Sequence, residues 1–138
     1  MKILITGVAG LVGSHLARRL AREHDVLALT HGDLDIADRA AVQRRVAAAQ
    51  PALIVNCAVL QVDESEQQPT KADAVNVDGP GFLAEAANDI GAEIVHFSTQ
   101  YAFEGEPVGR APYTIEDELR PVNQYGRTKL AGERAVRD

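Results

Sequence analysis

The segment KILITGVAGLVG, residues 2–13, decides the fold of this 138-residue chain. Residues 2–6 are a short β-branched run, which predicts a buried strand that stops at Gly7. From Leu11 to Glu23 the apolar residues recur at helical spacing, which predicts a helix. Three glycines, spaced Gly-x-x-Gly-x-x-Gly, therefore lie between a first strand and a first helix.

This glycine turn has the chemistry of a phosphate site. A strand-to-helix turn presents free backbone N–H groups at the positive end of the helix dipole, which suits a pyrophosphate. The first glycine permits a tight turn, the second a close approach of the phosphates, and the third close packing of helix on strand. We predict cofactor contacts from Gly7, Gly10, Leu11, Val12 and Gly13. A glycine-rich turn without a ligand is the alternative.

The rest of the chain alternates strand-like and helix-like segments. Strands are predicted at residues 26–29, 53–56 and 93–98, with a very short candidate at 33–36. Helices are predicted from the N-cap Asp38 to Ala49, within residues 65–90 before Gly91, and from about 122 to the end. A loop rich in glycine and proline, residues 100–121, precedes the last helix.

This order of elements predicts an α/β fold. Strands separated by helices of this length indicate βαβ units and a parallel sheet. Continuously apolar strands fit a sheet that is covered on both faces. Right-handed crossovers then give a doubly wound, Rossmann-like sheet. We expect residues 1–138 to form one NAD(P)-binding domain, with no second domain.

Composition limits the classes of partner. The net charge of −6 disfavours a polyphosphate backbone, so we expect no nucleic-acid partner. No apolar run approaches the roughly 20 residues of a membrane helix, so no membrane partner is expected. The one cysteine, Cys57, has no second cysteine to pair with, which favours a reducing cytoplasm. No metal site is predicted.

The residues after the second predicted strand are candidates for the adenosine end of a cofactor. An acidic residue there binds the ribose 2′-hydroxyl of NAD, and a basic residue accepts the 2′-phosphate of NADP. This chain has Thr30 and His31, which leaves NADP or NAD open, with NADPH slightly preferred. His31 is either a phosphate ligand or a solvated loop residue. Asp35 and Ile36 are candidates to contact the adenine, and Asp35 is alternatively a turn residue.

The sequence YGRTK, residues 125–129, opens the last predicted helix. Residues four apart share a helix face, so the Tyr125 phenol and the Lys129 ammonium can act together. The ammonium stabilises a phenolate, so Tyr125 can donate a proton to a carbonyl oxygen as hydride reaches the carbon. Lys129 can also bond the nicotinamide ribose, and Thr99 can donate to the same carbonyl oxygen. A surface pair without a function is the alternative.

Several segments together resemble the extended short-chain dehydrogenase/reductase superfamily, and within it the dTDP-4-dehydrorhamnose reductase family. They are the glycine turn, DLDI (33–36), VNCA (55–58), VDESE (62–66), NVDGP (76–80), STQYAFEG (98–105) and PVNQYGRTKLAGE (121–133). The last two are the most specific. Cys57 stands where the family usually has alanine, and Gln100 where it typically has aspartate, which alters the expected charge near the substrate.

The resemblance implies a reductase of a 4-keto-6-deoxy nucleotide sugar, with NADPH or NADH as the hydride source and Tyr125 as the proton donor. Carried over by position, the catalytic residues are Thr99, Tyr125 and Lys129. The further cofactor-site residues are Asn56, Cys57, Ala58, Asn76, Ser98, Tyr125 and Lys129, with Asn76 holding a backbone or water contact. The substrate-site residues are Thr99, Tyr101, Phe103 and Tyr125, although core packing is the alternative for Phe103.

The family continues after this helix with further strands and a C-terminal lobe that binds the sugar nucleotide. These parts are absent from the 138 residues, so we expect a cofactor-binding half that carries the catalytic residues. The alternatives are a non-catalytic dinucleotide-binding or regulatory subunit, a truncated fragment, and a nucleotide-sugar epimerase or dehydratase. A nucleotide sugar is the expected substrate. Apolar surface left uncovered would favour self-association, with a homodimer as the expected assembly.

Overall fold

The computed structural model of the protein describes residues 1–105 and 112–137. Its centre is a parallel sheet of β1 (Lys2–Thr6), β2 (Asp25–Leu29), β3 (Leu53–Asn56) and β4 (Glu93–His96). The strand order is β2-β1-β3-β4, so the chain winds outward from β1 in both directions. In the register, Ile5 pairs with Ala28 on one side and Val55 on the other. The predicted doubly wound α/β sheet is therefore confirmed.

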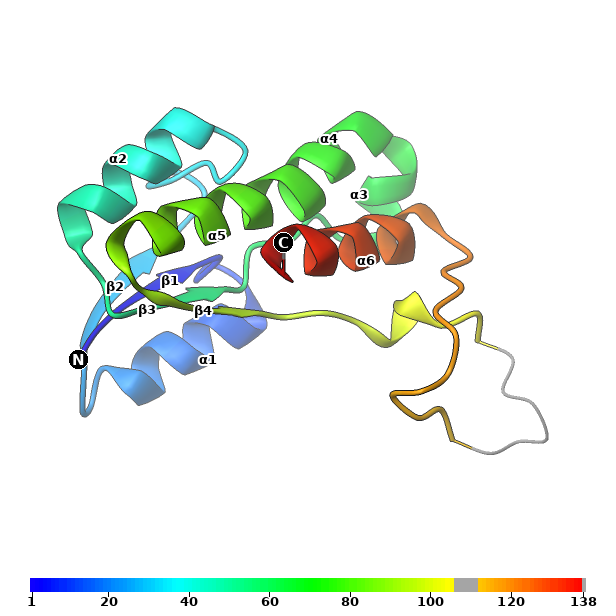
Figure 1. The fold of residues 1–138 in the computed structure, drawn as a ribbon, viewed down its shortest axis with the longest axis horizontal. Helices are drawn as coiled ribbons and strands as arrows, with labels where there is room; N and C mark the ends of the chain where they lie inside the picture. Colours follow the sequence, from blue (N-terminus) through cyan, green and yellow to red (C-terminus); the bar gives the residue numbers. More distant parts are fainter. Residues whose placement is uncertain (106–111, 138) are drawn as a thin grey trace.

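Helices cover both faces of the sheet (Figure 1). One face carries α1 (Leu11–Leu20), and the other carries α2 (Arg39–Ala49) and α5 (Gly79–Ile90). The remaining helical elements are α3 (Val62–Gln67), α4 (Pro69–Asp73), the π-helix η1 (Ala74–Asp78), the 3₁₀ helix η2 (Gln100–Ala102) and α6 (Gln124–Arg137). Within the described ranges, no helix is both long and apolar enough to cross a membrane.

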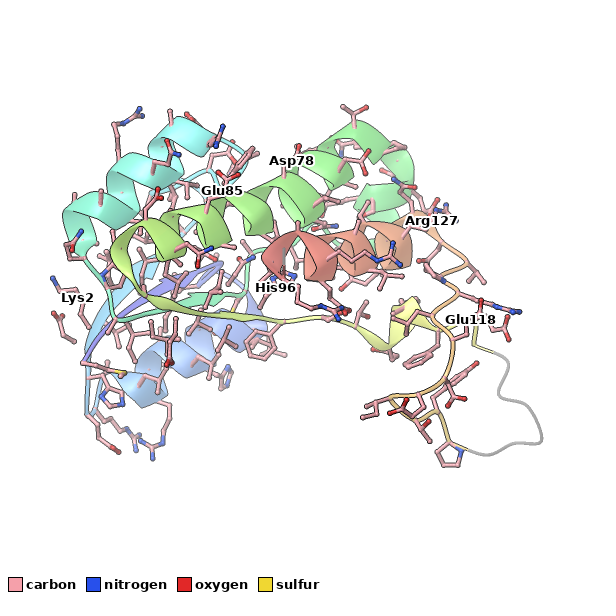
Figure 2. The ribbon with its side chains drawn as sticks, in the orientation of Figure 1. Lys2, Asp78, Glu85, His96, Glu118 and Arg127 are labelled. Carbon is pink, nitrogen blue, oxygen red and sulfur yellow. The ribbon has the colours of Figure 1, made fainter. Side chains whose placement is uncertain are left out.

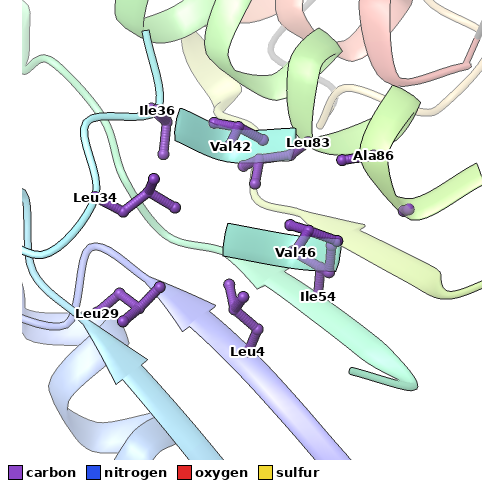
Figure 3. Close-up of a cluster of buried hydrophobic side chains, with 10 residues drawn as sticks. Leu4, Leu29, Leu34, Ile36, Val42, Val46, Ile54, Leu83 and Ala86 are labelled. Carbon is purple, nitrogen blue, oxygen red and sulfur yellow. The ribbon is translucent and has the colours of Figure 1, made fainter. Parts of the chain in front are cut away.

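The larger hydrophobic cluster lies between the sheet and the helices α2 and α5 (Figure 3). Leu4 and Ile54 enter it from the strands, Val46 from α2, and Leu83 from α5. A smaller cluster on the opposite face packs Ile3, Ile5 and Val55 against residues of α1. Successive side chains of a strand point to opposite faces, so Ile3, Leu4 and Ile5 of β1 are all apolar because both faces of this strand are buried.

The predicted helix 11–23 ends at Leu20 and the predicted strand 93–98 ends at His96, and two further predicted elements differ more in the structure. Residues 33–36 form turns instead of a strand, because the Asp33 carboxylate accepts hydrogen bonds from both the N–H and the hydroxyl of Thr30. The helix predicted within residues 65–90 begins at Val62 and is divided, with a non-helical backbone at Gln68 before Pro69. A proline disfavours helical geometry in the residue that precedes it. The predicted loop 100–121 includes residues 106–111, which lie outside the described residues.

Candidate functional site

The glycine turn joins β1 to α1 as predicted. Gly7 has a φ of +69°, and a Cβ there would lie 2.5 Å from the backbone nitrogen of Ala58. A Cβ at Gly13 would lie 2.5 Å from the carbonyl oxygen of Gly7, so these two glycines permit the close packing. Gly10 precedes α1, and no side chain of the described residues caps this helix. The first N–H groups of α1 are therefore available to an anion.

Two adjoining hollows lie along the carboxyl ends of the strands; we call them together the strand-end cleft. The first, of about 310 Å³, is lined by the glycine turn and by residues after β2 and β3. The second, of about 230 Å³, is lined in part by Val12, Phe97, Ser98, Tyr125 and Lys129. Both are bounded by the loop after β3, through Cys57, Ala58, Val59 and Gln61. This position is where doubly wound sheets bind ligands.

The first hollow reaches the segment after β2. His31, Asp35 and Ile36 line it, and the His31 side chain is 81% exposed. The Asp35 carboxylate also accepts a hydrogen bond from the N–H of Ala37, so it serves a turn as well as the hollow. Ile36 is buried in the core cluster. The Thr30 hydroxyl donates to the Asp33 carboxylate, and Thr30 is outside the set of described residues that line this hollow.

Tyr125 and Lys129 line the second hollow together, from the first two turns of α6. Lys129 is buried, and its Nζ donates to the carbonyl oxygen of Phe97 at 2.5 Å and lies 3.1 Å from Nε2 of His96. Burial lowers the pKa of Lys129 to about 8, although Glu133 and Cys57 act in the opposite direction. The phenol of Tyr125 and the amino group of Lys129 therefore lie in one hollow that is partly shielded from water.

The candidate residues that follow β4 make different contacts, and only some of them line the cleft. Ser98 lines the second hollow and donates a hydrogen bond to the carboxylate of Glu133. The Thr99 hydroxyl accepts from the N–H of Tyr101 and caps η2. The Tyr101 ring meets the Tyr125 ring edge-on, with centroids 5.6 Å apart. Phe103 stacks on Tyr113 with centroids 4.4 Å apart and is outside the set of described residues that line the cleft.

Asn76 is buried beneath the cleft. Its Oδ1 accepts from the N–H of Leu60, and its Nδ2 donates to the Leu60 carbonyl and to the Thr128 hydroxyl. These bonds tie the loop after β3 to α6, and that loop lines both hollows. Asn76 thus contacts backbone, and its place in the structure is that of a support for the cleft wall.

His96 is a residue of this site that the sequence analysis did not single out. Its Nδ1 lies 3.1 Å from Nδ2 of Asn56, and its Nε2 faces Lys129. Burial lowers the pKa of His96 to about 4, and the charge of Lys129 adds to this effect. The available signal was a polar residue that follows Ile94 and Val95 in the strand, two positions before Ser98.

Cys57 lies at the junction of the two hollows. Burial raises the pKa of its thiol, which keeps it neutral near pH 7, although Lys129 acts in the opposite direction. Nowhere in the described ranges do three or more histidine, cysteine, aspartate or glutamate side chains gather in a way that could hold a metal ion.

Comparison with known proteins assigns the family. The family model described as the RmlD substrate binding domain matches residues 1–138. The dTDP-4-dehydrorhamnose reductase of Mycolicibacterium smegmatis is 49% identical over 137 residues, which are 98% of this chain and 41% of that protein. The enzyme of the same name from Streptomyces griseus is 46% identical, over 96% of this chain and 44% of its own. The chain spans less than half the length of these curated relatives.

Solved structures show the same likeness. A dTDP-4-dehydrorhamnose reductase from Clostridium acetobutylicum superimposes with a TM-score of 0.94 at 41% identity, covering 99% of this chain and 49% of the other. The Bacillus anthracis protein of that name, solved in complex with NADP, has a TM-score of 0.92 at 33% identity, with coverages of 99% and 49%. The chain therefore belongs to the RmlD substrate binding domain family, the family of the dTDP-4-dehydrorhamnose reductases.

Proposed function

We propose that the strand-end cleft binds NADPH and that Tyr125 and Lys129 act there in the reduction of a 4-keto-6-deoxy nucleotide sugar. The observation that carries this proposal is that both residues line one hollow, which adjoins the hollow at the glycine turn. The curated relatives named dTDP-4-dehydrorhamnose reductase support the substrate class.

The cleft fits an extended dinucleotide. The N–H groups at the start of α1 suit the pyrophosphate, because no side chain of the described residues caps that helix. The adenosine end of the dinucleotide would lie near His31, Asp35 and Ile36. The chain carries no carboxylate at the end of β2, where Thr30 and the exposed His31 stand, and this favours NADP over NAD. The relative solved in complex with NADP supports the same choice.

The nicotinamide end would lie in the second hollow, and the bound cofactor would supply the hydride. Tyr125 donates its phenol proton to the substrate oxygen as the carbon is reduced. Lys129, held by the Phe97 carbonyl, stabilises the phenolate that results. Thr99 follows Phe97 and Ser98, which line this hollow, and its hydroxyl is the proposed second donor to the substrate oxygen.

The experiment is an assay of NADPH oxidation with dTDP-4-dehydrorhamnose, using the full-length product of the native gene and its Tyr125→Phe variant. We expect the variant to lose roughly 10²–10⁴-fold in kcat, the usual contribution of a positioned acid, while NADPH binding is unchanged. Tyr113→Phe is the matched control, because Tyr113 stacks on Phe103 outside the set of described residues that line the cleft.

Two results would contradict the proposal. Turnover by Tyr125→Phe close to the wild-type value would remove Tyr125 as the proton donor. Wild-type protein that binds NADPH and reduces no keto sugar would instead favour a dinucleotide-binding subunit without catalysis.

A further inference from the structure

His96 lies where the sheet meets α6 (Figure 2). It is between Asn56 and Lys129. Its two ring nitrogens each have a polar neighbour at 3.1 Å, Nδ2 of Asn56 on one side and Nζ of Lys129 on the other. Both neighbours carry N–H groups. The protonation of the ring therefore depends on which of the two neighbours must donate.

The backbone fixes the orientation of the Asn56 side chain. Its Oδ1 accepts from the N–H of Ala58 at 3.1 Å and from the hydroxyl of Thr6 at 2.6 Å. A backbone N–H can only donate, so the amide oxygen must face Ala58. The amide nitrogen then faces His96, and an amide nitrogen also only donates. Nδ1 of His96 is consequently an acceptor and carries no proton.

The same reasoning determines whether Nε2, at the other end of the ring, carries a proton. His96 is neutral near pH 7, since burial lowers its pKa to about 4, and a neutral imidazole carries one proton. With Nδ1 bare, that proton is on Nε2 and points at Lys129. An ammonium has three donors and no lone pair, whereas a neutral amine has a lone pair that can accept it. The hydrogen bonds are complete only when Lys129 is an amine that donates to the Phe97 carbonyl.

We propose that His96 is a positioning residue that stabilises the unprotonated amine of Lys129, through a ring tautomer fixed by Asn56. Its part in the reaction rests on the proposed function, whereas the tautomer does not. Among the described residues, the titratable groups around Lys129 are Tyr125 and Glu133 of α6, Cys57 after β3, and His96 of β4. Glu133 and Cys57 favour the ammonium form of Lys129. The Nε2–H of His96 opposes it.

The consequence is a lysine that releases a proton readily. When Tyr125 gives its phenol proton to the substrate oxygen, the phenolate takes one proton from the Lys129 ammonium across the hollow that both residues line. The ammonium becomes an amine, whose lone pair accepts the Nε2–H of His96. A solvent water then protonates the amine and leaves as hydroxide into bulk solvent, so the proton that the substrate consumes comes from solvent.

Nuclear magnetic resonance of the 138-residue chain, labelled with ¹³C and ¹⁵N and free of cofactor, tests the proposal. Long-range ¹H–¹⁵N spectra should show His96 protonated at Nε2 and bare at Nδ1. In a pH titration, His96→Gln should raise the Lys129 pKa by about one unit, a tenfold gain in proton affinity, because glutamine can turn its oxygen toward the ammonium. His15→Gln is the matched control, since His15 is exposed on α1 and contacts the Leu11 carbonyl.

An Nδ1–H tautomer in the wild type would overturn the proposal, and this readout needs no variant to fold. A Lys129 pKa that is unchanged or lower in His96→Gln would overturn it as well. Neither result depends on turnover. The expected tautomer and shift, together with a full-length product that reduces no keto sugar, would support the effect of His96 on Lys129 and contradict the proposed function.

Discussion

At the scale of single residues, Gly7 is restricted in two ways. It combines a positive φ with a neighbouring backbone so close that a Cβ would lie 2.5 Å from both Ala58 N and Cys57 C. Gly91, at the end of α5, has nearly the same φ of +70°, but nothing lies within 4 Å of a Cβ there. A substitution at Gly91 therefore tests the strain of a left-handed backbone alone. A substitution at Gly7 adds the steric overlap at the glycine turn.

We predict that Gly7→Ala lowers the free energy of unfolding by about 3 kcal/mol or more, because strain and overlap add. Gly91→Ala should lower it by about 1 kcal/mol, the cost of the left-handed conformation alone. Urea denaturation of both variants measures the difference. Equal losses would contradict the steric account of Gly7.

Some residues of the candidate site could be predicted from the sequence, and others could not. The glycine turn and the Tyr125–Lys129 pair could be found because each depends on local spacing, and the structure places both at the strand-end cleft. His96 was missed because its importance depends on β3 and α6 meeting around β4, which no local pattern expresses. The role of Thr30 stays a prediction, and the structure adds that its hydroxyl donates to Asp33, three residues later.

At the scale of elements, helix ends and strands were predictable where local chemistry sets them. The strand 53–56 and the helix that ends at Ala49 have the predicted limits, and the Asp38 carboxylate caps that helix by accepting from the N–H of Ala41. The division of residues 62–90 was not predicted. Its π-helix, Ala74–Asp78, contains Asn76, whose bonds reach Leu60 and Thr128 far along the chain.

We predict that Asn76→Asp lowers the free energy of unfolding by about 2–3 kcal/mol. The aspartate cannot donate, so the Leu60 carbonyl and the Thr128 hydroxyl lose their buried donor. Asn88→Asp, on the exposed side of α5, is the matched control and should change stability by less than about 0.5 kcal/mol. Thermal unfolding of the two variants checks this, and similar transitions would argue against Asn76 as the tie between the loop and α6.

At the scale of the whole molecule, the parallel sheet gathers the residues that line the strand-end cleft at the carboxyl ends of its strands. Because all four strands are parallel, the segments that follow β1, β2, β3 and β4 emerge together, and these segments line the cleft. α6 then completes the second hollow with Tyr125 and Lys129. This convergence follows from the strand order, which explains why a sequence pattern of alternating elements was enough to predict where the site lies.

The central claim is that this cleft binds a dinucleotide at the glycine turn, and calorimetric titration with NADPH tests it most directly. Gly10→Ala is the informative variant, because its Cβ would contact only the Gly7 carbonyl, at 3.3 Å, while it extends toward the space proposed for the pyrophosphate. We predict one saturable site in the wild type and in the control Gly91→Ala, and at least about tenfold weaker binding in Gly10→Ala. No binding by the wild type, or equal binding by a folded Gly10→Ala, would contradict the account.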